Sequence, residues 1–268
     1  MKKVRLDVLL VERGLAESRS LAQRMVMAGQ VRVSGQVVLK PATGVNLDAS
    51  VNIEKGPPFV SRGGEKLEAA LQAFGIDISG WICADVGAST GGFTDCLLKR
   101  GAARVYAIDV GKGILSWKLR QDTRVVVMEE TNARFLEKLP ESVELVTIDV
   151  SFISIKILLP VVRGWFDAST LTREGPEVGG EVFALVKPQF EAGKAETRRG
   201  SGVIREPAVH RRVLLDILSF AQAQNYGLKG LIRSPLLGPK GNVEFLAWLG
   251  YPSRDGGDSV DFTSRVLL

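Results

Sequence analysis

The fold of this chain is decided by the stretch Cys83-Ala84-Asp85-Val86-Gly87-Ala88-Ser89-Thr90-Gly91-Gly92-Phe93-Thr94-Asp95. An apolar run from Trp81 to Val86 leads into a turn of small residues, and a helix-like run from Phe93 to Lys99 follows. A strand, a glycine turn and a helix in this order form the cofactor site of a parallel α/β sheet. The cofactor held by this turn therefore indicates what the protein does.

From residue 81 onward, apolar strands alternate with helices. This alternation predicts a doubly wound, Rossmann-like α/β sheet of seven strands. The expected strands cover residues 81–86, 104–108, 124–128, 143–148, 181–186, 228–232 and 244–249. The expected helices cover about 93–100, 112–119, 132–138, 153–165 and 207–224, with loops at 167–180 and 188–206.

A small α+β domain is expected ahead of this sheet, over residues 1–54. It combines helices at 5–14 and from Ser18 or Ser20 to Met27 with short strands at 31–33, 37–39 and 51–53. Residues 55–61 form the predicted linker, because their glycine and two prolines stop regular structure. The α/β domain then covers residues 62–250, and the Asp/Gly/Ser-rich residues 251–268 are expected to be a flexible tail.

Positive charge is concentrated near the start of the chain. The net charge is +5, and residues 1–56 hold nine Lys/Arg against five acids, which gives +4 in the first fifth. Such a distribution favours a nucleic-acid partner, although a basic surface can also serve only to solvate a protein. The candidate nucleic-acid contacts are Arg5, Arg19, Arg24, Lys40 and, after the linker, Arg62.

Composition excludes several classes of site. With one histidine, His210, no zinc cluster can be assembled, and Ser-His-Asp or Cys-His catalysis would depend on that residue alone. Cys83 and Cys96 have neither metal nor redox spacing. No apolar run approaches the roughly 20 residues of a membrane helix, and no signal peptide is evident. We therefore expect a cytoplasmic protein that requires no metal and does not bind a membrane.

The glycine turn has the form Asp-x-Gly-x-x-x-Gly-Gly, which differs from the Gly-x-Gly-x-x-Gly turn for dinucleotides and from the Walker turn. S-adenosylmethionine has no phosphate and needs instead a glycine-lined path and an acid for its ribose hydroxyls. Asp109, at the end of the next strand, supplies a carboxylate that accepts two hydroxyl hydrogen bonds. Residues 129–132 follow the third strand, where an adenine amine is read. We therefore predict a methyl-donor site.

Four ionisable residues fall at the carboxyl edge of the predicted sheet. Asp149 and Lys187 follow the fourth and fifth strands, and Lys66 begins the helix before the first strand. Glu244 joins them if the last strand is antiparallel, as in methyltransferase sheets. Methyl transfer to a ribose hydroxyl needs a base, and a lysine can serve when a second ammonium and partial burial favour its neutral amine. The alternative is an ordinary salt-bridge cluster at the strand ends.

The first fifty residues resemble the RNA-binding module of the S4 family of small-subunit ribosomal proteins. The resemblance covers about residues 4–53 and implies RNA binding, with protein contact as the alternative. It is carried by Arg5-Leu6-Asp7, Gly14-Leu15, Ser18-Arg19, Ala22, Gly29-Gln30-Val31, Val33-Ser34-Gly35 and Lys40-Pro41.

The remainder resembles the FtsJ-type ribose 2′-O-methyltransferases, and the whole chain from about 4 to 250 is similar to the TlyA (hemolysin A) family. The motifs are Ser61-Arg62-Gly63-Gly64-Glu65-Lys66-Leu67, the 85–95 turn, Asp149-Val150-Ser151-Phe152-Ile153-Ser154, Val186-Lys187-Pro188-Gln189-Phe190-Glu191 and Gly238-Pro239-Lys240-Gly241-Asn242-Val243-Glu244.

The resemblance implies S-adenosylmethionine-dependent 2′-O-methylation of cytidine in ribosomal RNA, in the small subunit, the large subunit or both. It implies ribosomal RNA or ribosomal subunits as partners, and base or proton-relay roles for Lys66, Asp149, Lys187 and Glu244. The implied methyl-donor contacts are Asp85, Gly87, Ala88, Ser89, Gly91, Gly92, Phe93, Asp109, Glu130 and Asn132.

Other activities are less consistent with the residues. Cytosine C5 methylation uses a cysteine, commonly in a Pro-Cys pair, whereas Cys83 and Cys96 follow Ile82 and Asp95. Adenine amino methylation commonly uses an Asn/Asp-Pro-Pro-aromatic loop, which is absent. A non-catalytic RNA-binding factor and, from the family's second name, a membrane-active hemolysin are the remaining alternatives.

Overall fold

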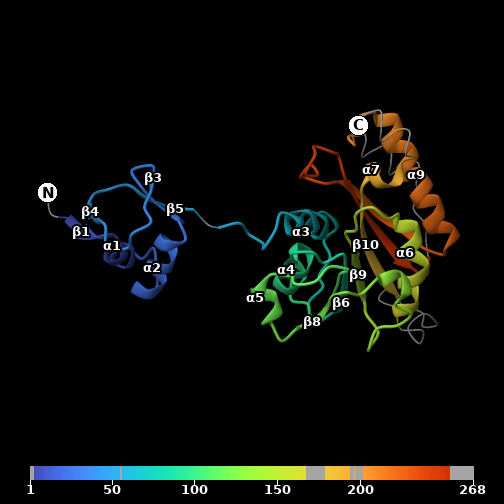
Figure 1. Ribbon diagram of the computed structural model, residues 1–268, viewed down its shortest axis with the longest axis horizontal. Helices are drawn as coiled ribbons and strands as arrows, with labels where there is room; N and C mark the ends of the chain where they lie inside the picture. The colour runs from blue at the N-terminus through green and yellow to red at the C-terminus, as the bar shows by residue number, and fades with distance from the viewer. Residues whose placement is uncertain (1–2, 55, 167–178, 194–195, 197–201, 254–268) are drawn as a thin grey trace. The chain divides into compact units, whose positions relative to one another are not determined.

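The computed structural model describes residues 3–54, 56–166, 179–193, 196 and 202–253 (Figure 1). It divides into two compact units, Met1–Pro58 and Phe59–Leu268. Residues 254–268 of the expected tail, 167–178 of the first predicted loop, parts of the second loop and residue 55 of the linker lie outside the described residues.

The larger unit is built on a seven-stranded sheet with the order β11-β12-β10-β9-β6-β7-β8. Strand β12 lies antiparallel to both of its neighbours, whereas β10, β9, β6, β7 and β8 run parallel. This confirms the predicted doubly wound sheet with an antiparallel last strand. The strands are β6 (Ile82–Val86), β7 (Arg104–Ile108), β8 (Val125–Met128), β9 (Leu145–Ile148), β10 (Gly180–Val186), β11 (Gly227–Arg233) and β12 (Phe245–Tyr251).

Helices cover both faces of this sheet (Figure 1). Along β10, Val182 and Ala184 belong to the core shared with α6 and α9, while Phe183 and Leu185 belong to the core shared with α3 and α4. Alternate side chains of a buried strand thus pack against helices on opposite faces. The helices are α3 (Gly63–Phe74), α4 (Gly92–Lys99), α5 (Trp117–Arg120), α6 (Ile155–Val162), α7 (Pro188–Glu191) and α9 (Pro207–Ala223).

Three predicted segments differ from the structure. The helix expected at 112–119 is only α5, because the segment before it turns at Gly113 (φ +70°). The helix expected at 132–138 is a single 3-10 turn, η1 (Ala133–Phe135), after which the chain becomes extended at Leu136. The loop expected from 188 begins instead with the short helix α7, which has Pro188 at its first position. A second 3-10 turn, η2 (Arg163–Trp165), follows α6.

The smaller unit packs two helices, α1 (Leu6–Glu12) and α2 (Arg19–Met27), on short strands. Ser18 caps α2 by accepting a hydrogen bond from the Leu21 amide at 3.2 Å. Strand β2 (Val31–Val33) pairs with β3 (Gln36–Val37) and β5 (Val51–Ile53). The pairing of β1 (Lys3–Arg5) with β4 (Gly44–Asn46) was not predicted, because three-residue strands carry too little apolar alternation to be recognised.

Candidate active site

The glycine turn after β6 holds the ends of two strands close together. At Gly87 (φ +84°), an added Cβ would lie 2.5 Å from the backbone oxygen of Asp149, so glycine is required for this close approach.

The start of α4, after the turn, is held by the side chain of Asp85, the fourth residue of β6. Its buried carboxylate accepts hydrogen bonds from the amide and hydroxyl of Thr94, at 2.9 and 2.7 Å, and from the Thr147 hydroxyl at 2.9 Å. Burial raises the pKa of Asp85 to about 6.

Two cavities adjoin this turn at the carboxyl edge of the sheet, where ligands of open α/β sheets bind. The larger, of about 880 Å³, is lined by residues of the turn and by residues at the ends of β9, β10 and β12. The smaller, of about 470 Å³, lies between the ends of β6, β7, β8 and β9. The two cavities adjoin each other, because both are lined by Gly87, Ser89, Asp149, Ser151 and Phe152.

The predicted methyl-donor residues are divided between these cavities and the interior. Asp85, Gly91 and Glu130 line neither cavity. Asp109 and Asn132 line the smaller one. The larger cavity is lined by Gly87, Ala88, Ser89, Gly92 and Phe93.

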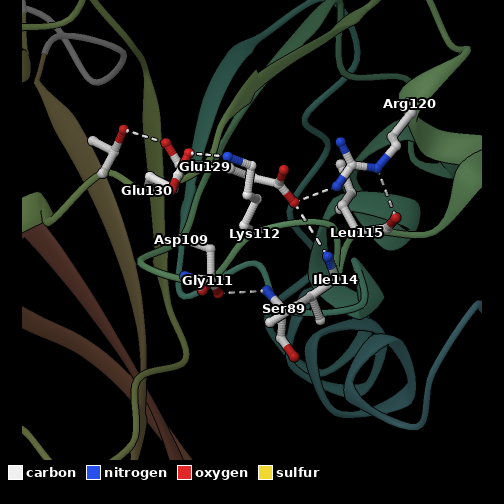
Figure 2. Close-up of polar contacts among 10 residues, drawn as sticks. Ser89, Asp109, Gly111, Lys112, Ile114, Leu115, Arg120, Glu129 and Glu130 are labelled. Atoms are coloured by element: carbon white, nitrogen blue, oxygen red, sulfur yellow. Dashed lines mark hydrogen bonds and ion pairs between the residues drawn. The ribbon is translucent and has the colours of Figure 1, made fainter.

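Asp109 is held in place by backbone amides (Figure 2). Its carboxylate accepts hydrogen bonds from the Ser89 amide at 2.8 Å and from the Gly111 amide at 2.7 Å. This ties the glycine turn to the loop that follows β7. The carboxylate keeps further lone pairs with which it can accept hydrogen bonds from a ligand in the smaller cavity.

The two glutamates after β8 brace the same loop (Figure 2). Glu129 accepts hydrogen bonds from the Ile114 amide at 3.2 Å and from the Arg120 guanidinium. Glu130 pairs with Lys112 at 2.9 Å, and both of these side chains are exposed. The structure therefore places the side chain of Glu130 on the outer surface, and Asn132 is the nearer residue to the smaller cavity.

The four ionisable residues predicted at the sheet edge all line the larger cavity, where they form two ion pairs. Lys66 Nζ lies 2.5 Å from Glu244 Oε2, and these side chains are only 10% and 1% exposed. Lys187 Nζ lies 2.6 Å from Asp149 Oδ1, with 11% and 21% exposed. The four residues come from different elements. Lys66 lies in the first turn of α3, Asp149 and Lys187 follow β9 and β10, and Glu244 precedes β12.

Two aromatic side chains at the larger cavity, Phe152 and Phe190, were not predicted as site residues. Phe152 is 90% exposed and adopts a positive φ of +67°, which is rare for a bulky residue and clusters at functional sites. Its ring centroid lies 4.9 Å from that of Phe190. A phenylalanine four residues after the end of a buried strand, in both cases, is the only sequence signal for this pair, because a backbone dihedral angle cannot be read from residue type.

Comparisons with known proteins agree with this geometry. Residues 59–251 match the model of the FtsJ-like methyltransferases, and residues 4–51 match that of the S4 domain. The chain belongs to the FtsJ-like methyltransferase family. It is 44% identical to the Mycobacterium tuberculosis 16S/23S rRNA (cytidine-2′-O)-methyltransferase TlyA, over 92% of this chain and 90% of TlyA.

Two further relatives support the same family. The chain is 48% identical to Bacillus subtilis YqxC, which is provisionally described as an rRNA methyltransferase, over 100% of this chain and 92% of YqxC. A solved structure from Streptococcus thermophilus, provisionally described as a hemolysin, superimposes with a TM-score of 0.72 at 41% identity, covering 100% of this chain and 95% of that one. In the part of the chain that the structure describes, no helix combines the length and apolarity needed to cross a membrane.

The predicted RNA contacts of this FtsJ-like chain differ in their location and in the partners of their charged groups. Arg62 lines the larger cavity. Arg5 and Arg19, in the S4 domain, pair with the buried carboxylate of Asp7 at 2.9 and 3.0 Å. Arg24 and Lys40 are exposed. All four candidate RNA contacts of the S4 domain are therefore exposed, and one buried carboxylate holds two of them.

Proposed function

We propose that this chain transfers a methyl group from S-adenosylmethionine to the ribose 2′-hydroxyl of cytidine in ribosomal RNA, of the 16S type, the 23S type or both. The observation that carries the proposal is the pair of lysine–carboxylate contacts, Lys66–Glu244 and Lys187–Asp149, in the cavity that the glycine turn also lines. The activity for which the tuberculosis relative is named supports the choice of nucleoside and RNA.

The residues around the turn fit S-adenosylmethionine. The smaller cavity joins apolar Ile108 and Leu158 to polar Asp109 and Asn132, which suits an adenine ring and its ribose. Asp109 would accept hydrogen bonds from the ribose hydroxyls, and the turn from Gly87 to Phe93 would lie along the methionine part. When bound, the donor supplies an electrophilic methyl group on a sulfonium sulfur.

Lys187 is the residue that we propose as the base. Its Nζ lies 2.6 Å from Asp149 Oδ1 and 3.2 Å from Ser151 Oγ, so its position is fixed on two sides. As the ribose oxygen forms its bond to the methyl carbon and the sulfur–carbon bond breaks, the hydroxyl proton passes to the neutral amine of Lys187. Asp149 then holds the resulting ammonium, and Lys66, fixed by Glu244, orients the ribose.

The exposed ring of Phe152 and the half-buried ring of Phe190, which both line this cavity, suit a nucleobase. RNA enzymes commonly bind an unstacked base on an aromatic side chain. A base on this platform would place its own ribose beside the two ion pairs, because both rings and all four ionisable residues line the same cavity.

The decisive experiment is Lys187→Ala. Removal of a positioned base typically costs 10²- to 10⁴-fold, so we expect methyl transfer to fall at least about 100-fold while RNA affinity changes less than about twofold. Transfer of labelled methyl groups and filter binding measure the two quantities. Lys229→Ala is the matched control, because Lys229 pairs with Glu181 and lines neither cavity.

Two outcomes would contradict the proposal. Equal losses of RNA binding and turnover in Lys187→Ala would remove the role of base. Absence of S-adenosylmethionine binding by calorimetry, with RNA present, would instead support the non-catalytic RNA-binding alternative. Mapping ribose methylation in ribosomal RNA from cells with and without this gene then identifies the modified nucleotide.

A further inference from the structure

Half of the proposed catalytic residues lie on two neighbouring loops. The loop after β9, residues 149–154, carries Asp149, and the segment after β10, residues 187–191, carries Lys187. The spacing of these two segments therefore sets the distance between the proposed base and its carboxylate partner. Contacts that bridge the two segments decide how well that spacing is fixed.

Three groups of contacts bridge the segments. At the cavity, Lys187 contacts Asp149 and Ser151 at 2.6 and 3.2 Å. At the mouth, the rings of Phe152 and Phe190 meet at 4.9 Å. Both groups belong to the side that substrate must approach, so substrate or a change of protonation can alter them.

The third bridge is made by Glu191 and is independent of the cavity. Glu191 Oε2 accepts a hydrogen bond from the Ser154 hydroxyl at 2.6 Å, and Oε1 accepts one from the Ile155 amide at 2.8 Å. Ser154 caps α6, so the carboxylate lies at the N-terminus of that helix. Glu191 lines neither cavity, and burial raises its pKa above the ordinary value.

We infer that Glu191 is a positioning residue that fixes the spacing of Lys187 and Asp149 by tying α7 to the N-terminus of α6. The inference rests on the proposed function of this site. A bidentate carboxylate restrains both the distance and the angle between the two segments, and it does so four residues from Lys187 and five from Asp149. A tie this close to the reacting groups controls their geometry, and a misplacement of about 1 Å can cost 100-fold in rate.

The test is Glu191→Gln, which keeps the size of the side chain. A glutamine keeps one oxygen that can accept from the Ile155 amide, but its NH2 group can only donate to Ser154 Oγ, which already accepts from the Lys156 amide. The two charge-assisted hydrogen bonds of the carboxylate are therefore lost. We expect kcat to fall about 10- to 100-fold, while the dissociation constant for S-adenosylmethionine by calorimetry stays within twofold. Because an ammonium freed from its carboxylate partner loses its proton more readily, the acidic limb of the pH–rate profile should move to lower pH. A merely structural role would not produce that movement.

Two further variants make the result interpretable. Glu181→Gln is the matched control, because the Glu181 carboxylate also accepts from two groups, Lys229 and Trp248 Nε1, but lies at the start of β10 and lines neither cavity, so this variant should leave kcat within twofold. Ser154→Ala removes one of the two bonds to Glu191 and should lower kcat about fivefold. In the double variant the losses should be less than multiplicative, because both substitutions remove the same tie.

The outcomes separate this inference from the proposed function. If the wild-type protein methylates RNA and Glu191→Gln retains kcat within twofold with an unshifted pH profile, the positioning role is wrong. If Glu191→Gln fails to fold, Ser154→Ala decides, and an unchanged kcat in that variant overturns the inference. A wild-type protein that binds RNA without methylating it would overturn the proposed function instead.

Discussion

Gly87 shows how one missing side-chain atom supports the site. Its φ of +84° is unfavourable for any residue with a Cβ, and that Cβ would meet the Asp149 backbone oxygen at 2.5 Å. We expect Gly87→Ala to lower the free energy of unfolding by more than the roughly 1–2 kcal/mol of the left-handed conformation alone. It should also weaken S-adenosylmethionine binding at least about tenfold, because the turn and the end of β9 must separate. Denaturant unfolding and calorimetry measure the two effects.

Gly113→Ala is the matched control for this prediction. Gly113 has a similar φ of +70°, but nothing lies within 4 Å of its added Cβ. Its substitution should therefore show the conformational cost without the steric one. Equal losses of stability in the two variants would mean that the close approach at Gly87 contributes nothing.

At the scale of single residues, the sequence predicted positions at strand ends better than it predicted side-chain directions. Lys187 and Asp149 directly follow buried strands, so their convergence on one edge follows from the parallel sheet. Glu130 and Phe152 adopt positive φ angles of +51° and +67°, which no residue pattern announces. Glu130, which we expected at the ligand, pairs with Lys112 and lines neither cavity, whereas Phe152, which was not expected there, lines both.

Among the elements, α1 and α2 are joined by a buried carboxylate. Asp7 accepts hydrogen bonds from Arg5 at 2.9 and 3.0 Å, from Gln23 at 2.9 Å and from Arg19 at 3.0 Å. The Arg5 hydrogen bonds, aided by Gln23 and Arg19, hold the pKa of Asp7 far below its ordinary value of 3.8. The folded state therefore binds fewer protons than the unfolded state, so this stabilisation is complete above about pH 4 and is lost as the pH falls.

This linkage predicts the behaviour of Asp7→Asn. The variant should lose about 1–3 kcal/mol of stability in the small unit at neutral pH, since charge-assisted hydrogen bonds become neutral ones. The difference from wild type should shrink as the pH falls below about 4, because the unfolded wild-type chain then binds a proton that the folded carboxylate excludes. Thermal unfolding across this pH range measures the difference.

Glu54→Gln is the control, because it breaks a half-exposed ion pair with Arg32. The free energy of unfolding of this variant should stay within about 0.5 kcal/mol of wild type. A loss of stability as large as that of Asp7→Asn would contradict the role of burial.

Elements with strong local signals were predicted from the sequence, and those formed by tertiary contacts were not. The apolar strands of the large sheet and the capped helix α2 lie within a few residues of their expected positions. The extended backbone at Leu136 is different, because its carbonyl accepts a hydrogen bond from Trp165 Nε1 at 2.8 Å, 29 residues away. Local propensity cannot report such a partner, and so the helix expected there is a single turn.

The molecule as a whole has separate hydrophobic cores. The core around Leu6, Leu10 and Val26 contains residues of the small unit alone, and the cores on the two faces of the sheet contain residues from Phe59 onward. Separate cores permit separate tasks. We propose that the S4 unit supplies RNA affinity and that the larger unit supplies methyl transfer.

That division predicts how RNA binding responds to salt. Arg24 is an exposed cation of the S4 unit, so Arg24→Gln should remove one phosphate contact. The affinity of this variant for ribosomal subunits should fall, and the slope of log affinity against log salt concentration should become shallower by about 1.

Arg13→Gln is the control. It makes the same change in charge, but the Arg13 guanidinium donates to the backbone oxygens of Leu47 and Ala49. It should therefore lower the stability of the S4 unit and leave the salt slope closer to wild type. If both variants change the slope equally, the net charge of the S4 unit determines RNA binding. The assignment of a phosphate contact to Arg24 would then be wrong.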